Sequence, residues 1–146
     1  MWRKHLAKFM RRPLADKWLF LQAFWLLGIA RVLINFIPFR RLANRMGQAM
    51  AATAPKPAPQ ELEQVRRVAW AVRNAAHITP WNSNCFPQAL AAKFLLRRWG
   101  IASTLYLGAA FADKESLKAH AWLRCGPKFV TGRSGHRQYK VVATFT

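Results

Sequence analysis

The sequence predicts an α+β protein in which helices come first and an antiparallel sheet follows. Two observations support this prediction. Apolar residues recur at helical spacing up to Gly100, whereas beyond it short β-branched and aromatic runs alternate with turn residues. Because helical and strand segments do not alternate along the chain, separate α and β layers are expected. The 146 residues suit one compact domain.

Residues 1–50 are expected to be helical, with a break at Pro38. The stretch from Trp18 to Phe39 is almost wholly apolar, but its charge-free part, Trp18–Ala30, has only 13 residues. This is fewer than the ~20 residues that cross a bilayer, and basic residues on both sides give no clear orientation. We expect these helices to pack on the rest of the domain or to lie in a membrane surface, and a transmembrane span is disfavoured.

A Pro/Ala-rich segment, Ala51–Pro59, is the predicted boundary in the chain. It separates an N-terminal hydrophobic and basic helical region, residues 1–59, from a second region, residues 60–146. The second region opens with a helix that has two glutamates in its first turn, where they favour the helix dipole. Apolar residues continue at helical spacing until a break at Ile78–Pro80.

The next helix is predicted to begin at Cys85. Asn84 is a suitable N-cap, Pro87 falls in the first turn, where its missing N–H has no cost, and Gly100 ends the helix. Unpaired N–H groups at a helix start favour the thiolate form of a cysteine and can donate to a developing oxyanion. Cys85 is therefore a candidate nucleophile, although a lone cysteine is more typical of a small buried apolar residue.

A histidine in the predicted sheet strengthens the interpretation of Cys85 as a nucleophile. His120 lies near the start of a strand, in the sequence Ala-His-Ala-Trp. Trp122 shares its face by the two-residue period and would shield a thiolate–imidazolium pair from water. A cysteine at a helix start followed by a histidine on a strand is an arrangement of cysteine acyl-transfer enzymes. The strands are predicted at residues 101–108, 119–125, 129–131 and 139–145.

Composition excludes several classes of protein. The 53% hydrophobic content is too high for a disordered basic tail, and two cysteines 40 residues apart form neither a disulfide scaffold nor a zinc knuckle. We therefore expect no metal, and Cys125 is interpreted as a non-catalytic thiol beside a turn. The formal net charge of +19 would attract nucleic acid, anionic lipid or an acidic peptide. Since no nucleic-acid-binding motif occurs, no specific nucleic-acid partner is expected.

The segments around Cys85 and His120 together resemble the transglutaminase-like leader peptidases of lasso-peptide biosynthesis. The resemblance covers roughly Leu62 to Phe145 and rests on Asn84-Cys85, the helix Gln88–Trp99, Gly100, a strand ending in Leu107-Gly108, and Ala119-His120-Ala121-Trp122. It implies a papain-like core with Cys, His and Asp in that chain order. It also implies a cysteine peptidase that cuts the leader from a ribosomally made precursor, so that an ATP-dependent cyclase can close the ring. No cofactor is implied.

Carried over to this sequence, the resemblance makes Cys85 the nucleophile and His120 the base, and later the acid for the leaving amine. The family's Asp lies at about residues 129–132, yet that segment and everything after it contain no acidic residue. Thr131 is the candidate orienting group, since a hydroxyl can accept from the imidazole N–H. A backbone carbonyl or His136 are the alternatives.

Three residues before the nucleophile are candidates for oxyanion or substrate binding, namely Trp81, Asn82 and Asn84. One of the two amides would donate to the oxyanion beside the Cys85 N–H. For Asn84 we favour the simpler role of a helix cap.

The partners expected from the resemblance are the precursor with its leader, the ATP-dependent lasso cyclase and a separate leader-recognition protein. A separate protein is expected because residues 1–59 are short of strands and do not read as a recognition element. The protein is expected in the cytoplasm, with peripheral membrane contact as a further expectation. Two alternatives stay open: another Cys–His acyl transferase of transglutaminase or amidase type, and a non-enzymatic basic protein that binds nucleic acid or a membrane surface.

Overall fold

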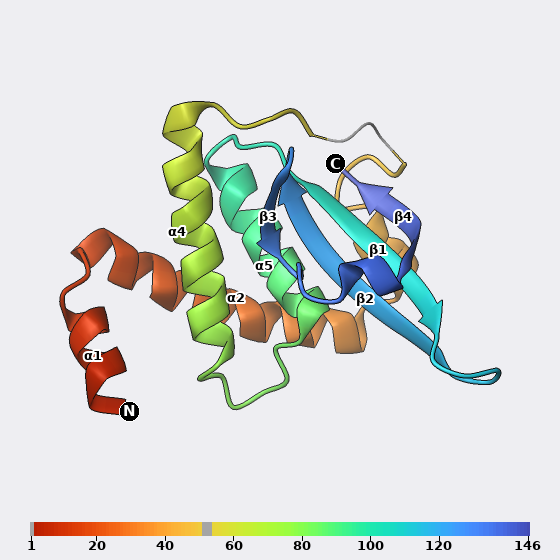
Figure 1. Cartoon of the computed structure of the whole chain (residues 1–146), viewed down its shortest axis with the longest axis horizontal. Coiled ribbons are helices and arrows are strands. Elements are labelled where there is room, and N and C mark those ends of the chain that lie inside the picture. The colour runs from red at the N-terminus through yellow and green to blue at the C-terminus, as the bar shows by residue number, and fades with distance from the viewer. Residues whose placement is uncertain (1, 51–53) are drawn as a thin grey trace.

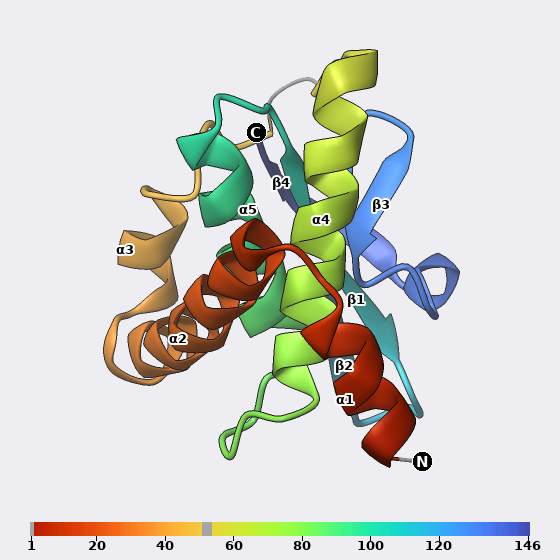
Figure 2. The same cartoon turned by 90° about the vertical axis from the view of Figure 1, so that its left-hand side faces the viewer.

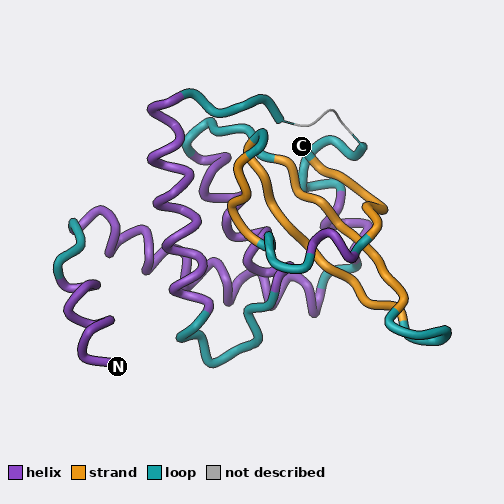
Figure 3. Tube along the Cα trace, viewed as in Figure 1, coloured by secondary structure: helices purple, strands orange, loops and turns teal. Residues whose placement is uncertain are grey.

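The computed structural model describes residues 2–50 and 54–146 and confirms the predicted α+β architecture. All the described α-helices precede the strands in chain order, as the red-to-blue colours of Figure 1 show, and Figure 3 distinguishes the helices from the strands. The α-helices are α1 (Trp2–Met10), α2 (Leu14–Phe36), α3 (Phe39–Ala43), α4 (Pro59–Ala76) and α5 (Cys85–Arg98). The strands are β1 (Thr104–Phe111), β2 (Leu117–Cys125), β3 (Lys128–Thr131) and β4 (Lys140–Phe145), with a 3-10 helix, η1 (His136–Gln138), between the last two.

The strands form one antiparallel sheet in the order β3-β2-β1-β4. β1 pairs with β2 along its whole length, from Thr104 opposite Arg124 to Phe111 opposite Leu117. Since β3 and β4 lie at opposite edges, residues 132–139 must cross from one edge to the other. Figure 2 shows η1, in this crossing segment, on the side of the sheet away from α5. The crossing segment therefore covers the face that the helices leave free.

The two faces of the sheet have different surroundings. Leu105, Ala121 and Leu123 are at most 2% exposed and belong to one core with residues of α2, α4 and α5. By the two-residue period of a strand, Tyr106 and Trp122 point to the other face. There their rings stack with centroids 5.6 Å apart and planes at 1°. The sheet thus has an aliphatic face toward the helices and an aromatic face beneath the crossing segment.

The N-terminal helices pack on the rest of the domain, which was one of the two expected arrangements. Leu19, Ala23 and Leu27 of α2 are 0–2% exposed and lie in the common core. Residues on both sides of the predicted boundary thus share one core. Residues 51–53 of the predicted linker lie outside the described residues, and the Ala54 N–H donates to Thr104 Oγ1 at 2.8 Å.

A buried carboxylate fastens the start of α2 to α4. Asp16 is 5% exposed and accepts from Arg67 Nε at 2.6 Å and from an Arg12 terminal nitrogen at 3.3 Å. A buried charge is tolerated when opposite charges and hydrogen bonds compensate its lost hydration. The Arg12 guanidinium also lies 4.4 Å from the centre of the Trp70 ring. These contacts hold α2 against the domain along its inner face.

Gly100 ends α5 as predicted, but the strand after it begins later than expected. Gly100 has φ +70°, its N–H bonds the carbonyl of Arg97, and the Ile101 N–H bonds that of Leu96. This pair of bonds is a Schellman motif, in which a buried apolar residue follows the glycine. Ile101 is 4% exposed and serves this helix end. β1 therefore begins at Thr104 and not at residue 101.

Candidate active site

Cys85 is the first residue of α5, as the local signals predicted. Asn84 occupies the N-cap position with an extended backbone, and Pro87 is buried in the first turn. The first N–H groups of α5 have no partner within the helix, because no helical turn precedes them to supply carbonyl acceptors. Cys85 is a half-buried free thiol beside these groups. The position suits a nucleophile whose attack creates an oxyanion near backbone N–H donors.

A side-chain network that sequence reasoning missed holds the loop before Cys85. The hydroxyls of Thr79 and Ser83 lie 2.7 Å apart, and Gln88 Nε2 in the first turn of α5 donates to the Ser83 carbonyl at 2.8 Å. The Thr79 hydroxyl oxygen also lies 3.2 Å from the carbonyl oxygens of Ala76 and of Trp81, and its one proton is shared between these acceptors. Ser and Thr in a segment between two helices are a recognisable signal of such a loop. The loop backbone is therefore tied to the helix that carries the cysteine.

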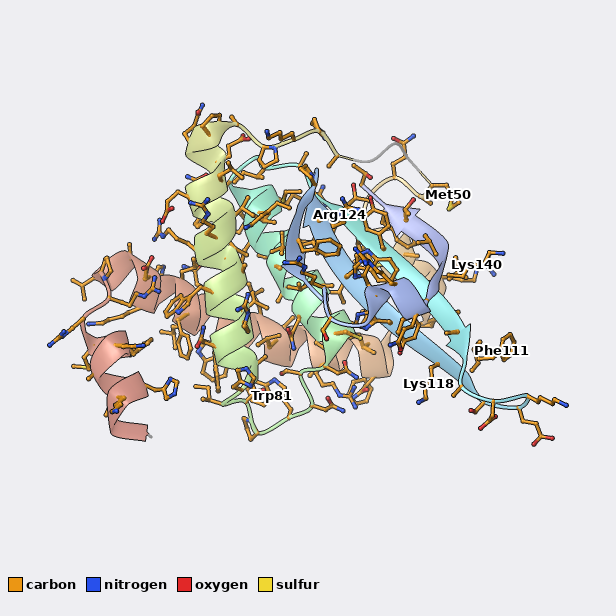
Figure 4. All side chains as sticks on the ribbon, in the orientation of Figure 1. Met50, Trp81, Phe111, Lys118, Arg124 and Lys140 are labelled. Atoms are coloured by element: carbon orange, nitrogen blue, oxygen red, sulfur yellow. The ribbon has the colours of Figure 1, made fainter. Side chains whose placement is uncertain are left out.

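The residues predicted to bind oxyanion or substrate have different surroundings. Trp81 turns toward α2, with its ring 5.0 Å from that of Phe24 and packed over Gly28, where an added Cβ would lie 2.9 Å from the indole. Figure 4 shows Trp81 in the loop below α4. Asn82 and Asn84 are exposed, and no side-chain hydrogen bond caps α5. The favoured capping role of the Asn84 side chain is therefore not seen, and its amide stays at the surface next to Cys85.

His120 is held in a defined tautomer by a backbone carbonyl. Its Nε2 lies 2.8 Å from the carbonyl oxygen of Gly132. Because a carbonyl oxygen only accepts, Nε2 must carry the proton and donate. In the neutral imidazole Nδ1 is then the unprotonated, basic nitrogen. The ring is half-buried between aromatic neighbours, with centroid distances of 5.8 Å to Trp122 and 5.0 Å to Tyr139.

Thr131, predicted as the orienting residue, does not hold His120. Its Oγ1 is buried and has no hydrogen-bond partner among the residues that the structure describes. His136 does not hold the imidazole either, because Nε2 of His120 is bonded to the Gly132 carbonyl, and Nδ1 of His136 donates to the Arg133 carbonyl at 2.6 Å. The group in the place of the family's Asp is the carbonyl of Gly132, one residue after Thr131. A backbone carbonyl was one of the alternatives, but no side chain marks it in the sequence.

Gly132 is required by the geometry of this contact. Its φ is +70°, and an added Cβ would collide with the carbonyl oxygen of Ala121 and lie 2.7 Å from Cβ of Trp122. A residue with a side chain would both strain the backbone and push the turn away from β2. The carbonyl is thus aimed at the imidazole by a turn that only glycine fits.

Gly108 leaves space for Trp122 and Tyr139 on the aromatic face of the sheet. It lies opposite His120 in the sheet, and an added Cβ would be 2.7 Å from Cβ of Tyr139 and 2.8 Å from the Trp122 ring. An isolated glycine inside a strand indicates close approach of another group, so the sequence carried a signal for this packing. Tyr139, which sequence reasoning missed, has no comparable signal.

The predicted nucleophile and base are not hydrogen-bonded to each other in the part of the chain that the structure describes. His120 and Trp122 share the aromatic face of the sheet, whereas Cys85 packs against the core on the helix side. The structure therefore brings His120, Trp122 and Gly132 together, and the pairing of Cys85 with His120 stays a prediction.

The second cysteine has a different environment. Cys125 is fully buried, and burial raises the pKa of its thiol to about 11. It is therefore protonated at neutral pH and shielded from reagents. Nearby, burial and the charge of Arg97 lower the pKa of Lys93 to about 8, while its Nζ donates to the carbonyls of Ser103 and Phe145.

No group of three or more His, Cys, Asp or Glu side chains suited to a metal ion occurs within residues 2–50 and 54–146. The chemistry available to the described side chains is that of a helix-start thiol and an oriented imidazole. Such a set serves nucleophilic acyl transfer, in which a thiolate attacks a carbonyl carbon. Cys85 and His120 are the residue types that this chemistry uses, but their pairing is not seen in the described residues.

The chain belongs to the transglutaminase-like superfamily, because a family model of that description matches residues 30–144. The match starts in the C-terminal part of α2 and ends within β4, so it includes both Cys85 and His120. Enzymes of this superfamily commonly depend on a cysteine and include peptidases and acyltransferases. Comparison with curated proteins and with solved structures found no match.

Proposed function

We propose that this protein is a cysteine peptidase that removes the leader from a lasso-peptide precursor. The observation that carries the proposal is the oriented imidazole: Nε2 of His120 donates to Gly132, which leaves Nδ1 as the base. In a Cys–His enzyme, the third catalytic group has the task of holding the imidazole in one tautomer. Family membership and the position of Cys85 at the start of α5 support the same chemistry. The leader-peptide substrate rests on the resemblance described from the sequence.

The proposed reaction requires Cys85 and His120, which the described structure does not join by a hydrogen bond, to come into contact. The Cys85 thiol then gives its proton to Nδ1 of His120, and the sulfur attacks the carbonyl carbon of the scissile peptide bond. The N–H groups at the start of α5 donate to the resulting oxyanion. The intermediate collapses by breaking the C–N bond, and the leaving amine takes the proton from Nδ1. Water then attacks the thioester while Nδ1 accepts its proton. The acid product leaves, and the thiol regains the proton.

The charge around His120 favours an acidic peptide. From Leu117 to the C-terminus the chain has six basic residues and no acidic one. Arg133 and Arg137 are exposed on the crossing segment beside His120, and Figure 4 shows Lys118 and Lys140 projecting from β2 and β4. Complementary charge speeds encounter and selects partners. We propose that this surface docks an acidic stretch of the leader, or of a separate leader-recognition protein.

The proposed place of the reaction is before ring closure, in the cytoplasm. Cleavage creates a new amino terminus on the core peptide. A reaction that joins this amine to a carboxylate needs activation of the carboxylate, so an ATP-dependent cyclase must consume the product. No cofactor enters the proposed hydrolysis, because thiol, imidazole and water supply every atom that moves.

The proposal is tested by incubating the full chain with a lasso precursor and a separate leader-recognition protein, followed by mass spectrometry. We expect loss of the leader with the wild type and none with Cys85→Ala or His120→Gln. Cys125→Ala is the matched control, because it removes the other thiol without touching the candidate site, and it should cleave. Cleavage by Cys85→Ala would overturn the assignment.

The same spectra distinguish another acyl-transfer reaction on this pair of residues. Hydrolysis adds one water across the cut bond, whereas transglutamination releases ammonia and joins two molecules. A product of joined mass without leader loss would assign the enzyme to the transferase alternative.

A further inference from the structure

A continuous apolar face runs along the outside of α2. We call it the α2 outer face, and its members are 43–81% exposed: Leu14, Trp18, Leu21, Trp25, Ile29, Val32 and Phe36. Their spacing of three or four residues places all of them on one side of a helix about 34 Å long. Figure 2 shows α2 at the surface, with no helix or strand across its outer side. Exposed apolar patches of this extent mark interaction sites.

The face does not belong to a transmembrane span. By length and composition alone α2 is long and apolar enough to cross a bilayer, and 22% of its most apolar window is buried inside the protein. Its inner side, however, carries Leu19, Ala23 and Leu27 in the common core, and Asp16 is paired with Arg67. A span would remove these residues from the core and would place Arg31 in hydrocarbon. The helix is therefore suited to lie flat on a surface while it remains docked to the domain.

The charges around the α2 outer face indicate that its binding partner is negatively charged. Arg11 and Lys17 lie at its N-terminal end, and Arg40 and Arg41 follow its C-terminal end. Between residues 17 and 60 the sequence has no acidic residue, and the one acid near the start of α2 is buried and paired. Apolar residues flanked by cations match the layered chemistry of acyl chains beneath anionic headgroups.

A pocket opens beside this face and has the same character. It lies between α2, α3 and α5, has a volume of about 320 Å³, and includes Ile29 of the α2 outer face. Its lining is mostly Leu, Ile, Met and Phe side chains, with the exposed Arg45 and Arg97 among them. An apolar pocket with guanidinium groups fits part of an acyl chain and its acidic headgroup.

We infer that the α2 outer face and the adjoining pocket bind the surface of an anionic phospholipid bilayer, with α2 parallel to the membrane plane. The apolar side chains enter the acyl boundary, and the flanking arginine and lysine side chains contact phosphate groups. The same face would not favour a nucleic acid, because its exposed area is aliphatic and aromatic along its whole length. The inference does not depend on the proposed peptidase activity.

The test uses the full chain and large unilamellar vesicles of phosphatidylglycerol and phosphatidylcholine, with pure phosphatidylcholine vesicles for comparison. Co-sedimentation should be at least about tenfold stronger with the anionic vesicles. Trp18→Ser combined with Trp25→Ser should weaken binding by at least about tenfold, because two large apolar groups leave the membrane. Phe111→Ser is the matched control: Phe111 is 76% exposed but lies at the far end of β1, and its loss should have little effect.

Because any protein of charge +19 is attracted to anionic vesicles, a second pair of variants separates local from general attraction. Arg41→Glu with Arg45→Glu and Lys114→Glu with Lys118→Glu change the net charge equally, but only the first pair adjoins the α2 outer face. We expect the first pair to bind several-fold more weakly than the second. Circular dichroism verifies that each variant is folded.

Three results would overturn the inference. The first is binding of the tryptophan variant to anionic vesicles as strongly as the wild type. The second is equal weakening by the two charge-reversal pairs. The third is a dimer by light scattering that the tryptophan substitutions dissociate, without vesicle binding by the wild type, since it would assign the face to a second copy of the chain. Leader cleavage is not measured in these experiments, so their failure leaves the peptidase proposal to its own test.

Discussion

Two glycines with the same backbone strain but different surroundings test how His120 is held. Gly132 has φ +70° and Gly135 has φ +75°. An added Cβ at Gly132 would meet Ala121 and Trp122, whereas at Gly135 no atom lies within 4 Å. Replacing each by alanine therefore imposes the same left-handed strain, but a steric conflict arises only at Gly132. The pair separates conformational strain from close packing against β2.

The expected magnitudes follow from these contacts. The left-handed conformation costs an alanine about 1–2 kcal/mol, which is the whole expected loss in the free energy of unfolding for Gly135→Ala. Gly132→Ala adds an overpacking cost of about 1–3 kcal/mol, since backbone and a β-carbon, not a flexible chain end, occupy the space. With a urea m-value of about 2 kcal/mol/M, the two midpoints should differ by about 1 M.

The Gly132 substitution should also release the imidazole. Nitrogen-15 spectra of the wild type should show His120 protonated at Nε2 when neutral, as its bond to Gly132 requires. Gly132→Ala should mix the two tautomers of His120 and lower the rate of leader cleavage. Gly135→Ala should change neither the tautomer nor the rate. Equal stability of the two variants, or an unchanged tautomer in Gly132→Ala, would refute the reasoning.

Three further substitutions test other parts of the structure. Thr131→Val should keep cleavage and raise the free energy of unfolding by up to about 1 kcal/mol, because it removes a buried hydroxyl with no partner among the described residues; a large loss of cleavage would restore Thr131 as the orienting group. Arg67→Met should lower the free energy of unfolding by about 3 kcal/mol in urea titrations, since it leaves the buried Asp16 carboxylate with one weaker partner, and a change below the measurement error would contradict this. The pKa of Lys93 falls from 10.5 in the unfolded chain to about 8 in the folded one, so between these pH values the unfolded state binds more protons and stability should rise with pH. Because the raised pKa of Cys125 acts in the opposite direction between pH 9 and about 11, the rise is best measured in Cys125→Ala, and a flat or falling profile from pH 8 to 10 would contradict the burial of Lys93.

Local signals were sufficient for the part of the site on α5. The N-cap residue Asn84, Pro87 in the first turn and Gly100 after the helix placed Cys85 at its start, and the structure has it there. These signals act within a few residues, because capping and proline geometry depend on the adjacent backbone. The later start of β1 shows the limit: Ile101 has a strand-forming side chain, but the Schellman bond to Leu96 commits it to the helix end.

Residue types did not identify which group orients His120. The sequence has no acid after Glu115, so the Thr131 hydroxyl was the predicted orienting group, with a backbone carbonyl or His136 as alternatives. The structure instead uses the carbonyl of Gly132, a group that every residue possesses and that no side chain announces. Its selection depends on the turn at Gly132, on the pairing of β3 with β2 and on the small size of glycine beside Trp122.

The sequence by itself determined the α+β order of elements, the helix that starts at Cys85 and the strand that carries His120 beside Trp122. It did so because hydrophobic periods, caps and turn residues act over short distances along the chain. Only the tertiary structure decided which group orients the imidazole, which side of α2 remains exposed and which face of the sheet the crossing segment covers. Those outcomes depend on contacts between segments far apart in the sequence, where packing and backbone hydrogen bonds, and not local preference, determine which arrangement has the lowest free energy.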